Sequence, residues 1–392
     1  MTIPIHPFPA RMAPEIALNE LGLLRRESLL LDPMTGSGTV VRVASENGHR
    51  GIAFDMDPLA VLMTKVWTTP ISTARLRTMG THIIRQAQHM PRTDVELPWI
   101  DSDSETLKFV DYWFGREQQA DLRKISALLT TLTGSVRDAL QIAFSRMIIT
   151  KKRGASLAWD VSHSRPHRVN RKNDFNVMGE FQRSIEFLAS RLEREPPRGR
   201  VDVKLGDARH LGDIQSCSVD AVITSPPYLN AIDYLRGHKL ALVWLGYRVA
   251  ELRAIRSESV GASRTDERRK YSDLVREITS DIESFDLLPA TDRRMFERYV
   301  RDLVLILSEI YRVLRRQGRT VFVVGNSCLR GVFIDNALAI STIANRLGFE
   351  SVSRNERELP ANRRYLPPPS EAERSDLKKR MRTEVVLRWR KR

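Results

Sequence analysis

The run Thr224-Ser225-Pro226-Pro227-Tyr228 combines groups that can hold and activate an aromatic amine. It follows an apolar, strand-like segment at 219–223, and its prolines cannot continue a central strand because each lacks an N–H group. They predict a stiff turn with carbonyl oxygens pointing outward. An amine held between the Ser225 hydroxyl and the Pro226 carbonyl, with its ring stacked on Tyr228, is pulled toward tetrahedral geometry, and its lone pair can then attack a sulfonium methyl group.

A second run, Asp32-Pro33-Met34-Thr35-Gly36-Ser37-Gly38-Thr39, lies between a strand-like segment and a segment at 38–47 that can form a helix. Glycines let a backbone turn tightly and approach a ligand closely, and a helix start offers unpaired N–H groups. Asp55 ends the next predicted strand, where a carboxylate can accept hydrogen bonds from both ribose hydroxyls. The separation of about 20 residues is typical of a fold that binds a nucleoside cofactor.

Both runs need a scaffold of alternating strands and helices. Short apolar or β-branched segments predict strands at 29–33, 51–55, 201–205, 219–223, 319–324, 348–353 and 383–389. Continuous apolar strands that alternate with helices indicate a mainly parallel sheet with helices on both faces. We therefore expect a doubly wound α/β fold, in which ligands bind at the carboxyl ends of the strands.

Residues 68–196 interrupt this alternation. They read as mainly helical, for example at 118–133 and 136–150, and they include the basic stretch Lys151-Lys152-Arg153. A second irregular, charged segment runs over 248–295. We therefore expect one catalytic domain formed by 1–67 and 197–392, with 68–196 as a helical insertion.

The chain is strongly basic. It has 63 Lys and Arg residues against 48 Asp and Glu, a formal charge of +15. This balance suits a polyanionic partner, because each neutralised phosphate releases counterions. A basic surface kept for solubility, or an anionic partner other than nucleic acid, fits it as well.

Other bulk features narrow the class of protein. No apolar run is long enough to span a membrane, and the N-terminus lacks the basic and apolar regions of a secretory signal. Cys217 and Cys328 are far apart and in no metal-ligand spacing. We therefore expect a cytoplasmic protein with reduced thiols, no membrane partner and no metal.

Together the two runs resemble the motifs of the amino-methylating DNA methyltransferases, which act on cytosine N4 or adenine N6. That family has a cofactor motif Asp-Pro-x-x-Gly-Ser-Gly-Thr, and its cytosine-N4 members typically carry the catalytic motif Ser-Pro-Pro-Tyr. The opening segment 6–15 also resembles the family's N-terminal segment over the cofactor's methionine end, and 230–234 and 238–244 resemble its continuation past the catalytic turn. Met34 departs from the family, which often has an aromatic residue there.

The resemblance implies a Rossmann-like class I methyltransferase fold, S-adenosylmethionine as cofactor and S-adenosylhomocysteine as product. It assigns Asp32, Gly36 and Gly38 to the methionine end of the cofactor, Asp55 to the ribose and Asp207 to the adenine amino group. The full set of cofactor-binding residues that we expect is Phe8, Asp32, Pro33, Gly36, Ser37, Gly38, Thr39, Asp55 and Asp207. The expected catalytic residues are Ser225, Pro226, Pro227 and Tyr228.

The resemblance thus predicts methyl transfer to cytosine N4 in DNA, with the target base flipped out of the duplex. Residues 68–196 are the first candidate for target recognition and 248–295 the second, and Arg165 and Arg168 could contact phosphates or guanine edges. Adenine N6, an RNA base, and a non-catalytic nucleic-acid-binding subunit with the same fold stay open as alternatives. A cognate restriction enzyme and the oligomeric state are also left open.

Overall fold

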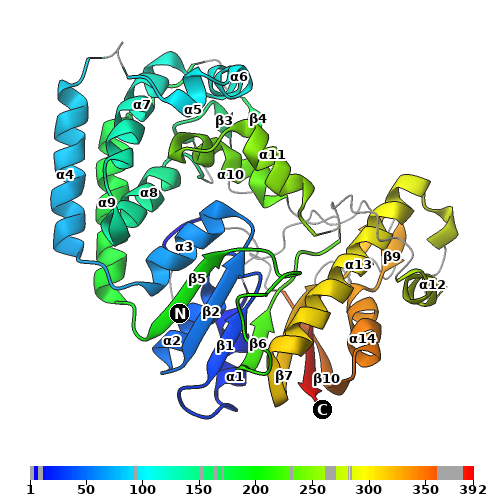
Figure 1. Ribbon diagram of the computed structural model, residues 1–392. Coiled ribbons are helices and arrows are strands. Elements are labelled where there is room, and N and C mark those ends of the chain that lie inside the picture. Colours follow the sequence, from blue (N-terminus) through cyan, green and yellow to red (C-terminus); the bar gives the residue numbers. More distant parts are fainter. Residues whose placement is uncertain are drawn as a thin grey trace.

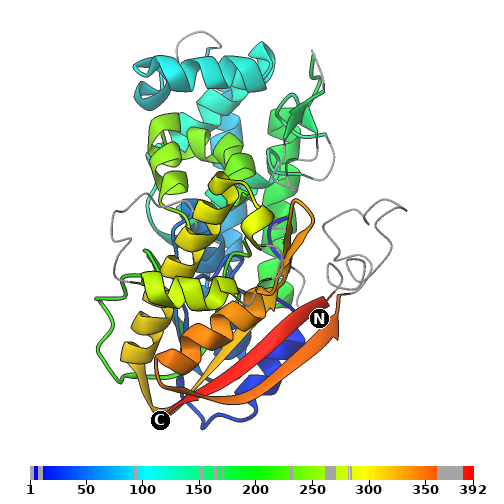
Figure 2. The ribbon, with the colours of Figure 1, turned by 90° about the vertical axis from the view of Figure 1, so that its right-hand side faces the viewer.

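The computed structural model describes residues 4–7, 12–91, 95–150, 153–159, 161, 166–169, 172–229, 233–260, 271–280, 282, 285–359 and 383–392. They form two parts. One is a sheet with helices on its faces, and the other, here called the helical layer, stands above the sheet (Figure 1). Figure 2 shows the same division after a turn of 90°, with the long strands β10 and β11 crossing beneath the helical layer.

Seven strands form the central sheet, in the order β10-β11-β7-β6-β1-β2-β5. The strands are β1 (Leu29–Asp32), β2 (Arg50–Asp55), β5 (Arg200–Leu205), β6 (Val219–Thr224), β7 (Leu314–Gly325), β10 (Phe349–Glu358) and β11 (Thr383–Lys391). β11 is antiparallel to both of its neighbours, and the other neighbouring pairs are parallel. Every strand predicted from the sequence lies in this sheet, so the predicted mainly parallel, Rossmann-like α/β fold is confirmed.

The strand order reverses beside β1. From β1 the chain passes through α2 (Thr39–Glu46) to β2 on one side, while β6 and then β7 pair on the other side. In open α/β sheets, ligands bind outside the carboxyl ends of the strands at such a reversal. The ends of β1 and β6 are therefore the place where the fold favours a ligand.

Helices cover both faces of the sheet. α1 (Pro14–Leu21) and α2 pack on the face that buries Leu30, while α13 (Ala290–Val313) and α14 (Asn336–Arg346) pack on the face that buries Leu31. Successive side chains of a strand point to opposite faces. Burial of both faces explains why the central strands are continuous apolar runs in the sequence.

The helical layer has its own apolar core. Its helices are α4 (Thr73–His89), α5 (Pro98–Asp101), α6 (Ser104–Trp113), α7 (Arg116–Thr130), α8 (Gly134–Arg146), α9 (Val177–Arg194), α10 (Tyr234–Leu242), η2 (Val243–Leu245) and α11 (Val249–Ser257). A short hairpin, β3 (Ala158–Trp159) and β4 (His167–Arg168), belongs to the same layer. α3 (Pro58–Thr68) contacts both this layer, through α8, and the sheet, through β5.

α10 and α11 complete the helical core although they follow the catalytic turn in sequence. Trp99 Nε1 donates to the Val243 carbonyl over 2.8 Å, and the Val249 N–H donates to Thr106 Oγ1 over 2.9 Å. The sequence prediction confined the helical insertion to 68–196. The structure adds 234–257 to its core, so two separate stretches of chain build this layer.

The remaining elements lie beside α13 and the end of β7. They are α12 (Ser272–Ser280), η3 (Phe285–Leu287), β8 (Ser327–Leu329) and β9 (Val332–Ile334). No helix among the described residues is long and apolar enough to cross a membrane.

Candidate active site at the carboxyl ends of β1 and β6

One buried hydrogen bond joins the two motifs predicted to do chemistry. Asp32 is the last residue of β1 and Thr224 the last residue of β6. Thr224 Oγ1 donates to Asp32 Oδ1 over 2.7 Å, although 192 residues separate the two in sequence. The glycine-rich loop and the Ser225–Tyr228 turn therefore leave the sheet at the same point, where the strand order reverses.

The loop after β1 requires glycine. Gly36 and Gly38 have φ angles of 52° and 81°, in the left-handed region that side chains disfavour. A Cβ at Gly38 would lie 2.8 Å from Thr64 Oγ1 and 3.1 Å from Thr64 Cα. The loop therefore runs close against α3, and α2 begins at Gly38 without a capping side chain.

Polar groups of this loop fit a bound ligand. The Thr35 hydroxyl is buried and has no hydrogen-bond partner among the described residues. Buried polar groups usually have partners, so Thr35 is suited to contact a polar ligand. Ser37 and Thr39 are also buried, with their hydroxyl oxygens 3.2 Å apart, and Pro33 is buried beside them.

Asp55 closes the loop from β2. Its Oδ2 accepts from the Gly36 N–H over 2.8 Å and its Oδ1 accepts from the Asp57 N–H over 2.9 Å. Burial, and next the charge of Asp57, raises the pKa of Asp55 to about 6. Each carboxylate oxygen has a second lone pair, so Asp55 keeps the capacity to accept further hydrogen bonds, and its contact with ribose hydroxyls stays a prediction.

Asp32 is almost fully buried, with 2% of its surface exposed. Burial raises its pKa to about 7, although the Thr224 and Met34 hydrogen bonds act in the opposite direction. Asp55 adds to the rise by charge repulsion. Two acidic side chains with raised pKa values thus lie at neighbouring strand ends, a pattern that is more frequent at functional sites than elsewhere.

Asp207 follows β5 and is held by an arginine that the sequence analysis did not single out. Arg209 Nε and Nη2 donate to Asp207 Oδ2 over 2.9 and 2.7 Å, while Arg209 Nη1 donates to Asp302 of α13 over 3.0 Å. Arg209 Nη2 also reaches the Glu258 carbonyl at 2.6 Å. If Asp207 binds the adenine amino group as expected, the same carboxylate also accepts the hydrogen bonds from Arg209.

The Ser225–Tyr228 turn, which the sequence analysis predicts to be catalytic, is fixed by β7. Ser225 Oγ donates to the Val323 carbonyl over 2.9 Å, which leaves its lone pairs to accept hydrogen bonds. Pro226 is buried, while Pro227 and Tyr228 are half-buried. A Cβ at Gly325 would lie 2.8 Å from Tyr228 Cε2, so the Tyr228 ring occupies the space above Gly325 at the end of β7. The sequence analysis did not identify Gly325.

A buried acid–imidazole pair connects the two sides of the site. Asp57 Oδ1 caps α3 by accepting from the Leu59 N–H over 2.9 Å, and Asp57 Oδ2 lies 2.5 Å from His238 Nδ1 on α10. Both side chains are buried. The chain just after Asp55 is therefore tied to the helix just after the catalytic turn, a relationship that the sequence analysis also missed.

Some predicted residues contribute nothing to this geometry. Phe8 and Arg165 lie outside the described residues. Arg168 is described and is exposed on β4, in the helical layer. Within the described ranges, no three His, Cys, Asp or Glu side chains group so that they could hold a metal ion.

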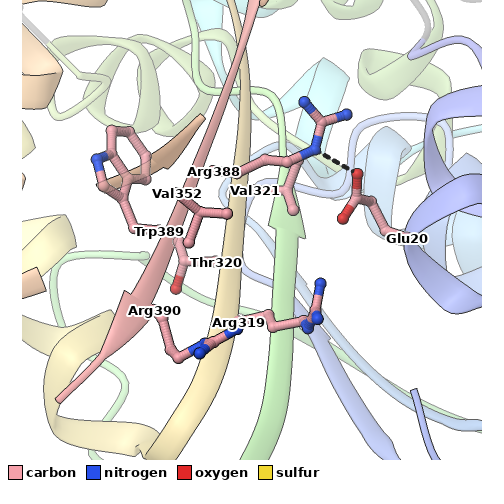
Figure 3. A pocket seen from close by; sticks show the side chains of 8 residues that line it. All are labelled: Glu20, Arg319, Thr320, Val321, Val352, Arg388, Trp389 and Arg390. Atoms are coloured by element: carbon pink, nitrogen blue, oxygen red, sulfur yellow. Dashed lines mark hydrogen bonds and ion pairs between the residues drawn. The ribbon is translucent and has the colours of Figure 1, made fainter. Parts of the chain in front are cut away.

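A small hollow on the α1 face of the sheet is not part of this site. It holds about 20 Å³ and is lined by Glu20, Arg319, Thr320, Val321, Val352, Arg388, Trp389 and Arg390 (Figure 3). Arg388 Nε closes one side by donating to Glu20 Oε1 over 2.6 Å. The hollow lies toward the end of the sheet opposite to Gly325 and the catalytic turn.

Curated proteins with related sequences are methyltransferases. M.MvaI of Kocuria varians, a type II methyltransferase, is 21% identical over 388 residues, which cover 91% of this chain and 84% of that protein. M.BsoBI of Geobacillus stearothermophilus, also a type II methyltransferase, is 22% identical over 86% of this chain and 75% of its own length. The chain is similar to type II methyltransferases along most of its length. No protein-family model matches it.

A solved structure gives a more distant likeness. An S-adenosylmethionine-dependent methyltransferase from Methanosarcina mazei is 10% identical, covers 97% of this chain and 99% of its own, and has a TM-score of 0.35. A likeness at this level carries no inference about activity.

Proposed function

We propose that this chain transfers the methyl group of S-adenosylmethionine to the N4 amino group of cytosine in DNA. The observation that carries the proposal is the hydrogen bond from Thr224 to Asp32, because it puts the glycine-rich loop and the Ser225–Tyr228 turn side by side where the strand order reverses. The similarity to type II methyltransferases over 91% and 86% of the chain supports a methyltransferase.

The residues around the loop fit the cofactor. Gly36 and Gly38 keep the backbone close, the Thr35 hydroxyl is buried without a partner, and Asp55 offers carboxylate oxygens at the end of β2. When bound, S-adenosylmethionine supplies a methyl group on a positively charged sulfur. The partly buried carboxylate of Asp55 would hold the ribose, and Asp207 the adenine amino group.

The catalytic turn would orient the amine. Because Ser225 Oγ donates its proton to Val323, it faces the amine only as an acceptor. The Pro226 carbonyl supplies the second acceptor, and the Tyr228 ring above Gly325 supplies a stacking surface. The amine nitrogen then forms the bond to the methyl carbon as the carbon–sulfur bond breaks, the sulfur keeps the electron pair, and the nitrogen loses a proton to solvent.

The choice of DNA and of cytosine rests on two features. The net charge of +15 favours a polyanionic substrate. Ser225 at the head of the Pro-Pro-Tyr motif is typical of the cytosine-N4 members of the family that the chain resembles. Adenine N6 is the alternative base, because its amine could be held by the same two acceptors.

The proposal is tested by incubating the protein with mixed-sequence duplex DNA and S-adenosylmethionine, digesting the DNA to nucleosides and identifying methylated species by mass spectrometry. We expect N4-methylcytosine with the wild type and none with Ser225→Ala, while Ser351→Ala, at an exposed position of β10 outside both candidate recognition regions, serves as the matched control. N6-methyladenine would overturn the choice of base. Product on RNA alone would overturn the choice of DNA, and no product despite S-adenosylhomocysteine binding would overturn the enzyme assignment.

A further inference from the structure

We propose that the β3–β4 hairpin is a contact surface for duplex DNA, in which Trp159 and Val169 enter a groove from one face of the ribbon and Arg168, on the other face, meets the phosphate backbone beside it. The proposal deepens the proposed function and rests on it, because it identifies where the helical layer meets the substrate.

Three large hydrophobic side chains are exposed on this hairpin and on the helix that is joined to it. The exposed fractions are 48% for Trp159, 63% for Val169 and 51% for Tyr112 at the end of α6. The hairpin is joined to α6 because the Leu157 N–H donates to the Trp113 carbonyl over 2.7 Å, and Val169 pairs back to Leu157 over 3.2 Å. Contiguous exposed apolar groups mark interaction surfaces more often than isolated ones do.

The pairing register sorts the hairpin side chains. Trp159 is paired with His167, and Ala158 with Arg168. Ala158 is buried in the helical core while Trp159 and His167 are exposed, so the latter two stand on the outer face of the ribbon. Arg168 shares the face of Ala158 and is exposed beside Tyr112. An aromatic ring and an imidazole thus project from a ribbon only two strands wide, a shape that the major groove of B-DNA admits.

Arg168 is displayed on an aromatic support. Its guanidinium carbon lies 4.8 Å from the centroid of the Tyr112 ring, which restricts the side chain while leaving it exposed. Within the described part of the chain it makes no ion pair, whereas Arg77 and Arg253 are each bound to glutamates. A phosphate is the partner that suits an arginine held in this way.

The charge of the surrounding sequence matches DNA. Residues 151–172 contain seven Lys or Arg residues and one Asp, a net charge of +6 in a chain whose total is +15. In Figure 2 the hairpin projects from the helical layer toward the right, the side toward which β10 also runs.

Duplex binding measured by fluorescence anisotropy tests this proposal without requiring methyl transfer. We expect Trp159→Ala to weaken binding about tenfold with little change in its salt dependence, because it removes a groove contact. We expect Arg168→Ala to lower the slope of log affinity against log salt by about 0.9, the value for one phosphate contact. Leu23→Ala and Arg346→Ala are the matched controls. Leu23 follows α1, Arg346 is the last residue of α14, and both side chains are exposed.

The thermal shift with S-adenosylhomocysteine reports whether each variant folds and keeps its cofactor site. Hairpin variants that bind duplex as the two controls do, in affinity and in salt slope, would overturn the proposal. Wild-type binding to single-stranded RNA but not to duplex DNA would also overturn it. Loss of duplex binding in the hairpin variants supports the proposed DNA-contact surface even if the wild type yields no methylated base. The test of this surface is therefore separable from the test of the proposed function.

Discussion

His238 Nδ1 lies 2.5 Å from Asp57 Oδ2, and this contact joins the helix that follows the catalytic turn to the helix that follows the cofactor carboxylate. Asp57 also caps α3, so one carboxylate serves two elements. Both side chains are nearly out of contact with solvent. The contact therefore fixes α10 against the start of α3.

Two substitutions of His238 distinguish the contribution of its hydrogen bond to stability from the contribution of its packing. His238→Leu removes the donor and leaves a buried carboxylate short of a partner, which costs about 1–3 kcal/mol. His238→Asn puts an amide N–H close to the position of Nδ1 and should restore most of that loss. Urea unfolding midpoints of the two variants check this, and equal midpoints would show that the hydrogen bond does not stabilise the fold.

The raised pKa of Asp32 predicts an unusual dependence of stability on pH. Its folded-state pKa is about 7 against 3.8 for the free side chain, so its stabilising contribution is present below pH 3.8 and is lost as the pH rises through 7. The shift corresponds to roughly 4 kcal/mol between the two limits. The midpoint of Asp32→Asn relative to the wild type should therefore rise steadily from pH 4 to pH 8, and a difference that is independent of pH would contradict this account.

The raised pKa of Asp55 predicts that ligand binding weakens as the pH falls, which is opposite in direction to the predicted change in stability. Its pKa of about 6 means that the carboxylate, which accepts hydrogen bonds from ribose hydroxyls, is lost as the pH falls through 6. The dissociation constant of S-adenosylhomocysteine should rise between pH 7 and pH 5, as measured by calorimetry. Asp55→Asn should bind weakly with a flatter profile, and an equally steep profile in that variant would assign the titration to another group.

The contact between Tyr228 and Gly325 can be tested by a double-mutant cycle. Gly325→Ala forces the ring to move, so we expect methyl transfer to slow about tenfold or more while cofactor binding is unchanged. Tyr228→Phe keeps the ring and should retain activity, whereas Tyr228→Ala should leave only a low residual rate, which single-turnover assays with excess enzyme can measure. In the Tyr228→Ala background, Gly325→Ala should have no further effect. Additive losses would mean that the two residues act separately.

Local sequence patterns predicted the sheet and both loops well, because a buried strand must be apolar and a tight ligand-binding turn must contain glycine or proline. They could not predict contacts between distant segments. Gly325 is 97 residues beyond Tyr228, and the pairing of His238 with Asp57 depends on how α10 docks. Likewise, the sequence analysis described 248–295 as irregular, whereas α11 and α12 are helices in the structure. Nothing in the local pattern says that α11 packs into the helical layer.

The two-part construction of the helical layer has a consequence for synthesis of the chain. α4 to α9 end at Arg194, but their core is completed only when α11 ends at Ser257, which is 63 residues later (257 minus 194). At roughly 5–20 residues per second, the ribosome needs about 3–13 s to synthesise the residues between these two points. During that interval the nascent helices expose the apolar surface that α10 and α11 later cover, and chaperone binding at this stage would protect it from aggregation.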